Sequence, residues 1–209
     1  MEHYKQYRIG HLTTSRKEIV DLAKAWLVIS TAFAILLHGL SFDAGFVLAF
    51  ILSAFTVGTG FLVHELAHKI VAQHYGCDAE FRSFDSMLLL ALAMSFFGVI
   101  FAAPGAVFIN GPVGVIRNGK ISMAGPLTNI IFAVIFLSGL FVFSTGALHE
   151  LAHYGFVING WLGLFNMLPF WNFDGKKILA WNKIIYGAMV GIGVFFLILQ
   201  IAGQNRGWF

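Results

Sequence analysis

The sequence predicts an all-α polytopic membrane protein with about five transmembrane helices, one re-entrant or interfacial hydrophobic segment and a small membrane-associated β-sheet. Hydrophobic residues make up 58% of the 209 residues and charged residues only 11%. The mean hydropathy of +0.81 is far from the balance of a soluble domain. Several apolar runs are long enough to cross a hydrocarbon core of about 30 Å. We expect one membrane-embedded domain over residues 1–209.

The expected spans follow one another with short loops. Four long apolar runs and a shorter one are expected to cross the membrane, at residues 25–41, 44–63, 126–147, 184–203 and, for the shorter run, 155–170. Ahead of the first run, Ser15 is followed three residues later by Glu18, a capping box that predicts a helix start. No small-residue cleavage site is evident, so this N-terminal region is expected to be retained.

Residues 104–123 are the least helical stretch. Pro104, the Gly-Pro pair at 111–112 and the Asn118-Gly119 pair lie among alternating residues, and Asn-Gly is a strong hairpin signal. A small sheet at the inner membrane face is therefore expected here. Pro126 is expected in the first turn of the next span, where its missing N–H does no harm.

The apolar segment 86–103 decides the topology of everything after it. If it crossed the membrane, the later basic residues would lie outside. If it forms a re-entrant or interfacial hairpin turned near residues 95–98, and the N-terminus is cytoplasmic, all of the 13 Lys and Arg except Arg206 lie inside. This distribution follows the positive-inside rule and argues against a nucleic-acid-binding surface. We therefore favour the hairpin, with a complete crossing as the alternative.

The pentapeptide His-Glu-Leu-Ala-His occurs twice, at residues 64–68 and 149–153. Residues i and i+4 of a helix share one face, so two imidazoles at this spacing can hold one metal ion with the Glu beside it. A catalytic zinc site needs a third protein ligand and one open position. Each copy is therefore a metal site only if a third ligand lies within reach.

The first copy has a candidate third ligand. At 1.5 Å per residue, His64 lies about 30 Å below the outer loop, near the inner edge of the hydrocarbon core. Polar side chains at that depth usually face a cavity and have partners. Pro169 breaks the 155–170 run, and the irregular stretch after it brings Asp174 to a similar depth. Asp174 is the natural third ligand; a helix cap or turn residue is the alternative, because Asp174-Gly175 is also a turn signal.

The second copy follows the third span and is expected at the outer face, roughly a bilayer thickness from Asp174. Only Glu150 itself and the distant His38 or Asp43 could supply a further ligand. We therefore interpret His149 and His153 as interfacial or loop histidines, with a second zinc site as the alternative.

Three motifs occur in order: HELAH at 64–68, AGPLTN at 124–129 and NMLPFWNFDG at 166–175. Together they resemble the pattern of the site-2 protease family of intramembrane zinc metalloproteases, over roughly residues 45–180, in a minimal form without PDZ or regulatory domain. The resemblance implies one Zn²⁺ per chain, bound by His64, His68 and Asp174. It also implies Glu65 as catalytic base and Asn166 as a contact to substrate or the tetrahedral intermediate.

The resemblance implies a hydrolase that cleaves transmembrane segments of membrane-protein substrates in regulated intramembrane proteolysis, with the inner strands pairing with the unwound substrate. Transmembrane substrates and the lipid bilayer are the expected partners, without nucleic acid. The active site is expected near the cytoplasmic side of the cell membrane. The alternative is a non-catalytic zinc-binding membrane protein, a transporter or sensor, which would have no need for Glu65 beside its ligands.

Overall fold

The computed structural model describes residues 6–10, 12–100 and 103–206, which form two compact, mostly helical units, Met1–Pro112 and Val113–Phe209. Among the described residues, four helical segments are long and apolar enough to cross a membrane, namely Arg16–His38, Ala44–His74, Val115–Val142 and Lys183–Gln204. The expected fifth span corresponds to a 20-residue helix, Ala147–Asn166, which is not among those four. That the chain forms a single domain stays a prediction.

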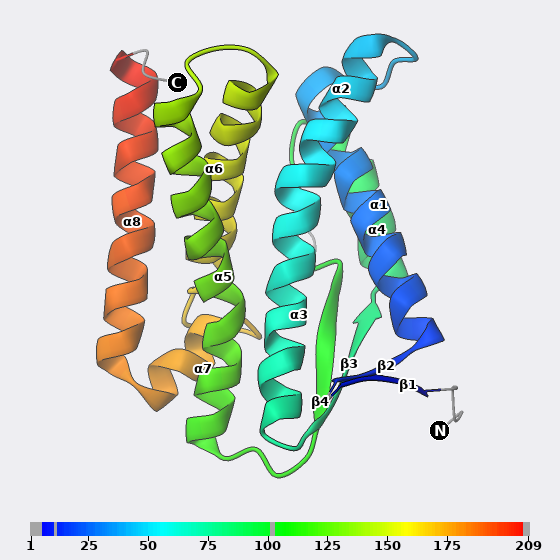
Figure 1. Ribbon diagram of the computed structural model, residues 1–209, viewed down its shortest axis with the longest axis vertical. Coiled ribbons are helices and arrows are strands. Elements are labelled where there is room, and N and C mark those ends of the chain that lie inside the picture. Colours follow the sequence, from blue (N-terminus) through cyan, green and yellow to red (C-terminus); the bar gives the residue numbers. More distant parts are fainter. Residues whose placement is uncertain (1–5, 11, 101–102, 207–209) are drawn as a thin grey trace. The chain divides into compact units, whose positions relative to one another are not determined.

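The first unit combines long helices with two small antiparallel sheets (Figure 1). Its first helix begins where the capping box predicted, because the Ser15 side chain accepts a hydrogen bond from the Glu18 backbone N–H at 3.2 Å. In chain order the elements are β1 (Gln6–Ile9), β2 (Leu12–Ser15), α1 (Arg16–His38), α2 (Ala44–Ser53), η1 (Ala54–Gly58), α3 (Thr59–His74), β3 (Asp78–Ser83), α4 (Asp85–Ser95) and β4 (Gly105–Asn110).

The second apolar segment contains a short π-helix, η1, between α2 and α3. The wider turn is held from outside, since the Trp26 indole N–H donates to the Ala54 carbonyl at 3.2 Å. Gly58 lies directly against α1: a Cβ there would come within 2.6 Å of the Ser30 Oγ. The close packing of α1 on η1 therefore requires a residue without a side chain at position 58. Segments of π-helix often occur near functional sites, and α3 carries the first HELAH.

The predicted hairpin at 104–123 was wrong in its pairing. Residues 105–110 do form a strand, β4, but it pairs with β3, and Asn118-Gly119 lies inside a helix. Gly119 is helical because of packing: a Cβ there would lie 2.3 Å from the Cβ of Trp181. Tertiary contact with a neighbouring helix thus overrides the local turn signal. Alternation in residues 78–83, with Ala79 and Phe81 buried, was the overlooked strand signal.

The segment between β3 and β4 leaves the sheet and returns to it at the same pair of residues. Ser83 is paired with Gly105, and the Phe84 N–H donates to the Pro104 carbonyl at 2.9 Å. Its helix α4 has only 11 residues, about 16 Å of helix, which is too short to cross a hydrocarbon core. The chain turns after α4 through Gly98, whose φ is +77°. The short helix and the return to the same residue pair fit the expected re-entrant or interfacial hairpin, which stays a prediction.

An exposed ion pair ties the start of α4 to α1. The Lys24 ammonium donates to the Asp85 carboxylate at 2.5 Å. This hydrogen bond, together with one from the Ser83 hydroxyl, lowers the pKa of Asp85.

The second unit packs four helices around one apolar core. They are α5 (Val115–Val142), α6 (Ala147–Asn166), α7 (Asp174–Trp181) and α8 (Lys183–Arg206). Pro126 is buried in the interior of α5, so the expectation that it opens the span was wrong. The helix instead begins at Val115. The core residues are Ile130, Ala133, Phe156, Met167, Ile178, Met189 and Phe196.

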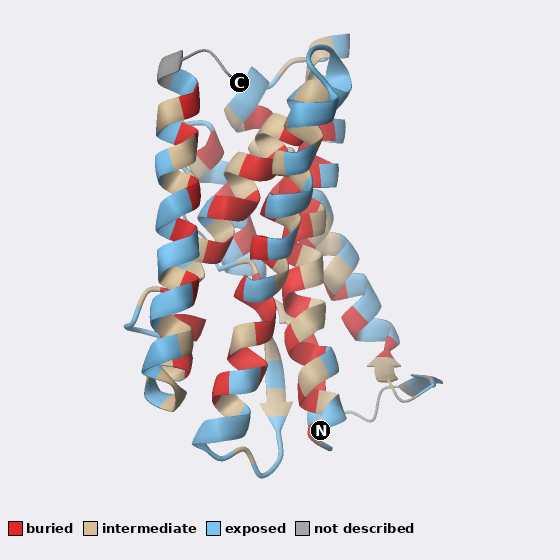
Figure 2. Ribbon diagram, turned by 60° about the vertical axis from the view of Figure 1, so that its left-hand side comes forward, coloured by how far each residue is buried: buried red, intermediate tan, exposed pale blue. Residues whose placement is uncertain are grey.

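Large apolar side chains are exposed along the predicted spans. Only 22% of the most apolar window of α8 is buried, and Figure 2 shows exposed residues along the whole of this helix. In water such surfaces would associate, whereas hydrocarbon is a good solvent for them. The exposed faces therefore fit a protein surrounded by lipid. On α8 they include Ile184, Ile192, Val194, Phe195, Ile198 and Ile201.

A buried ion pair joins three elements of the first unit. The Lys69 ammonium of α3 bonds to the Glu18 carboxylate of α1, and both side chains are almost completely buried. The other oxygen of Glu18 accepts the Phe81 backbone N–H of β3 at 2.9 Å. The Thr14 hydroxyl also donates to this carboxylate at 2.7 Å. Glu18 therefore fixes the positions of α1, α3 and β3 relative to one another.

We predict that Lys69→Met lowers the free energy of unfolding by about 3 kcal/mol or more, because it leaves the Glu18 charge buried and unpaired. Adding Glu18→Gln should recover part of this loss, since Gln keeps an acceptor for the Phe81 N–H without a charge. Lys24→Met removes the exposed pair and should cost about 1 kcal/mol or less. Thermal unfolding in detergent measures all three. Equal effects of Lys69→Met and Lys24→Met would contradict the assigned role of the buried pair.

Candidate metal centre

The first HELAH lies on α3, which ends at His74. His64, Glu65 and His68 are all buried. The Nε2 atoms of the two histidines are 3.0 Å apart, and their rings are nearly perpendicular, at 84°. His64 and His68 are one helical turn apart, so both imidazoles are directed at a common point. Glu65 is the residue directly after His64 in the sequence.

This pair fits a zinc ion. Two nitrogens at 2.0–2.1 Å from one tetrahedral zinc are separated by roughly 3.3 Å, close to the observed 3.0 Å. Neutral imidazole is a preferred zinc ligand. One metal ion can accept the lone pairs of both ring nitrogens.

The contacts that hold α3 in place were not predicted. Lys69 directly follows the second histidine, and its bond to Glu18 anchors this turn of the helix to α1. One turn later, the Gln73 amide donates to the Ala79 carbonyl of β3 and to the Thr13 carbonyl of β2, both at 3.0 Å. A charged residue inside an apolar helix was the available signal for Lys69, because such a charge needs a buried partner.

Asp174 is the first residue of α7, in the second unit, and is buried. An irregular turn from Met167 to Phe173 precedes it, as Pro169 predicted. Gly175 is in contact with this turn, since a Cβ there would lie 2.1 Å from the Met167 carbonyl oxygen. The close approach holds the start of α7 against the end of α6. The Asp174 carboxylate also lies 3.7 Å from the Lys177 ammonium.

Asn166 is the last residue of α6 and is half-buried. Its side-chain amide donates to the Leu162 carbonyl one turn earlier at 2.9 Å. An amide NH₂ carries two hydrogens, so one donor is used within the helix and the second can serve another acceptor. A role for Asn166 toward substrate stays a prediction.

The Asn of the AGPLTN motif, Asn129, lies in the interior of the second unit. Asn129 of α5 donates to the Asn159 carbonyl oxygen of α6 at 3.1 Å, and both residues are completely buried. Asn159 in turn donates to the Gly155 carbonyl at 2.9 Å. This motif residue therefore joins two helices through side-chain hydrogen bonds.

The second HELAH occupies the first two turns of α6. His149 Nδ1 lies 2.8 Å from the Phe143 carbonyl oxygen, and Glu150 is exposed. Residues 153–166 separate this copy from the end of α6 that leads to α7, about 20 Å of helix. In the described part of the chain, His149, Glu150 and His153 belong to no group of three potential metal ligands. Both histidines are helical, so the expectation of loop histidines was wrong, and an interfacial position stays a prediction.

Comparison with known proteins places the chain in a family. No protein-family model matches the sequence, and no solved structure matches it. A protein of Methanocaldococcus jannaschii with the name "Putative zinc metalloprotease" is 41% identical over 181 residues, which cover 85% of this chain and 91% of that protein. With this identity over nearly the full length of both chains, the protein belongs to the zinc metalloprotease family that includes this archaeal relative.

Proposed function

We propose that the protein is an intramembrane zinc metalloendopeptidase of the site-2 protease type, which cleaves transmembrane segments of other membrane proteins. The observation that carries this proposal is the buried histidine pair, with Nε2 atoms 3.0 Å apart, beside Glu65. These residues lie within an apolar helical segment long enough to cross a membrane, Ala44–His74. The family relationship to a zinc metalloprotease supports the choice of metal and reaction.

Asp174 is the proposed third ligand. Two imidazoles and one carboxylate form a donor set that can hold a metal ion, and three protein ligands leave the fourth position of zinc open. Gly175 supports this role indirectly, because its contact with Met167 limits where the Asp174 backbone can lie. One Zn²⁺ per chain is proposed.

Hydrolysis would use the side chains of the chain as follows. When bound, zinc supplies Lewis-acid chemistry that makes water nucleophilic near neutral pH and polarises a carbonyl. Glu65 would accept a proton from the attacking water as the new C–O bond forms. As the C–N bond breaks, Glu65 would return that proton to the leaving amine nitrogen. The second amide hydrogen of Asn166 would donate to the developing oxyanion.

Substrate would add a strand to β4. The outer edge of β3 is occupied, since Glu18 accepts the Phe81 N–H and Gln73 donates to the Ala79 carbonyl. In the register, Ala79 and Phe81 lie opposite Ile109 and Val107. In an antiparallel pair of strands, two residues directly opposite each other either both point their N–H and C=O groups at the partner strand or both point them away from it. The N–H and C=O groups of Val107 and Ile109 therefore point away from β3, where an extended substrate segment could form hydrogen bonds with them.

The positive-inside distribution supports a cytoplasmic N-terminus, and the site would then lie near the cytoplasmic side of the membrane. The proposed partners are a transmembrane substrate and the bilayer. Before cleavage the substrate helix must unwind locally, because its carbonyl groups are hydrogen-bonded within the helix.

Zinc content discriminates between the two HELAH copies. We expect about one zinc per purified wild-type chain and almost none in His68→Ala, since two remaining ligands bind weakly. His153→Ala, the matched change in the second copy, should keep the wild-type content. Elemental analysis of the three proteins measures this. Zinc kept in His68→Ala but lost in His153→Ala would overturn the assigned site.

Glu65→Gln separates proteolysis from metal binding. We expect zinc to be retained while cleavage of a single-span model substrate falls by about 100-fold or more, because general acid–base transfer contributes at least that much. Metal content and gel-based cleavage are measured on the same preparation. Undiminished cleavage would remove Glu65 from the mechanism, and absence of cleavage by the zinc-loaded wild type across substrates would favour the transporter or sensor.

The β4 edge is tested by removing one outward N–H. Ile109→Pro should lower kcat/KM roughly fivefold, the value of about one backbone hydrogen bond, without lowering zinc content. Ile109→Val keeps the N–H and is the control. If both variants cleave as well as wild type, substrate does not pair with this edge.

A further inference from the structure

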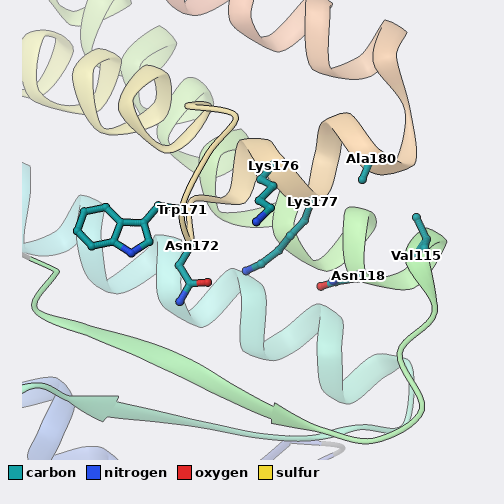
Figure 3. Close-up of a pocket in the computed structure, with 7 residues that line it drawn as sticks. All are labelled: Val115, Asn118, Trp171, Asn172, Lys176, Lys177 and Ala180. Carbon is teal, nitrogen blue, oxygen red and sulfur yellow. The ribbon is translucent and has the colours of Figure 1, made fainter.

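The second unit contains a cavity that the proposed chemistry does not use. Its volume is about 240 Å³, and Figure 3 shows that it lies between the first turn of α5, the turn before α7 and α7 itself. Its polar lining consists of two lysines, Lys176 and Lys177, and two amides, Asn118 and Asn172. A cavity with two ammonium groups and two amide groups has the donors for an anion with several oxygens.

The charge around this cavity is strongly positive. Residues 113–209 contain only two acidic residues, Glu150 and Asp174, against six Lys and Arg. Glu150 lies in the first turn of α6, at the end remote from α7. Asp174 offsets only Lys177, at 3.7 Å. No hydrogen bond or ion pair with another described residue engages the Lys176 ammonium, so an anion would not have to displace an existing partner.

The rim of the cavity is apolar and exposed. Trp171 is 71% exposed and Val115 is 61% exposed, and both line the cavity. Trp171 has a φ of +52°, an uncommon conformation for a non-glycine residue. Cations beside an exposed indole match the chemistry of the membrane interface. A single residue, Asn182, separates the end of α7 from the start of α8 at Lys183, and α8 is a predicted span.

We propose that this cavity binds the phosphate group of an anionic phospholipid from the surrounding membrane. The Lys176 and Lys177 ammonium groups neutralise the phosphate, and the amide N–H groups of Asn118 and Asn172 donate to its oxygens. Trp171 and Val115 contact the glycerol and the upper acyl chains. Free phosphate would use only the polar half of this surface, whereas a phospholipid uses both halves.

Lipid binding is coupled to Asp174 through Lys177. A phosphate in the cavity competes with the Asp174 carboxylate for the same ammonium group, which lies 3.7 Å from that carboxylate. Withdrawal of the ammonium leaves the carboxylate more available to a metal cation. This consequence rests on the proposed function, whereas the lipid site itself does not.

The test is retention of lipid by the full-length protein in neutral detergent, measured by native mass spectrometry. Phosphatidylglycerol and phosphatidylcholine are titrated separately, and inorganic phosphate is added as a competitor. The variant Lys176→Ala/Lys177→Ala is compared with Lys120→Ala/Lys183→Ala, which removes the same charge from lysines of α5 and α8 that do not line the cavity. Wild type should bind phosphatidylglycerol more tightly than phosphatidylcholine. The affinity of the cavity variant for phosphatidylglycerol should be lower than that of wild type by a factor of about ten or more. The affinity of the control variant should be close to that of wild type.

Four results would overturn the proposal. They are equal binding of the two lipids by wild type, equal losses in the two double variants, displacement of phosphatidylglycerol by inorganic phosphate at similar concentration, and unchanged lipid binding in the cavity variant. In the last case, loss of cleavage only for substrates with acidic residues would assign the cavity to the protein substrate. His68→Ala, which should lack zinc, should still bind phosphatidylglycerol more tightly than the cavity variant does. The lipid site and the protease proposal can therefore fail separately.

Discussion

The ion pair between Glu18 and Lys69 is the interaction on which the first unit depends. A charge in a medium of low dielectric constant is unfavourable without a partner, so α1 and α3 must lie where the two side chains meet. The Glu18 carboxylate also binds the β3 backbone at Phe81. A single group thus fixes two elements around the helix that carries His64 and His68. The apolar contacts among these elements bury surface area, but they are non-directional and do little to fix how the elements are oriented.

The second unit achieves similar order with neutral groups and small residues. Asn129 and Asn159 join α5 to α6, and the Gln200 amide of α8 lies 3.3 Å from the Phe156 carbonyl oxygen of α6. Close packing requires glycine at particular contacts: a Cβ on Gly155 would lie 2.3 Å from the Phe136 ring. Small residues and interhelical hydrogen bonds replace the hydrophobic effect where lipid is the solvent.

Local signals in the sequence predicted the local features well. The cap at Ser15 and the break after Asn166 each depend on a few neighbouring residues, and so do the i, i+4 imidazoles. Features that arise from distant contacts were missed. Gly119 is helical because Trp181 packs on it, and β4 pairs with β3 rather than with its own downstream residues. The π-helix η1 cannot be recognised from the spacing of apolar residues in the sequence. Its wider turn nevertheless changes which side of α3 lies in line with a given side of α2.

The meeting of Ser83 and Gly105 at the base of α4 affects how this family can vary. Because Ser83 and Gly105 are paired, the chain returns to the sheet at the residue pair where it left. Insertions, deletions or an exchanged segment there would leave the register of β3 with β4 unchanged. The segment between these two residues can therefore differ in length or sequence while the sheet that β3 and β4 form stays the same.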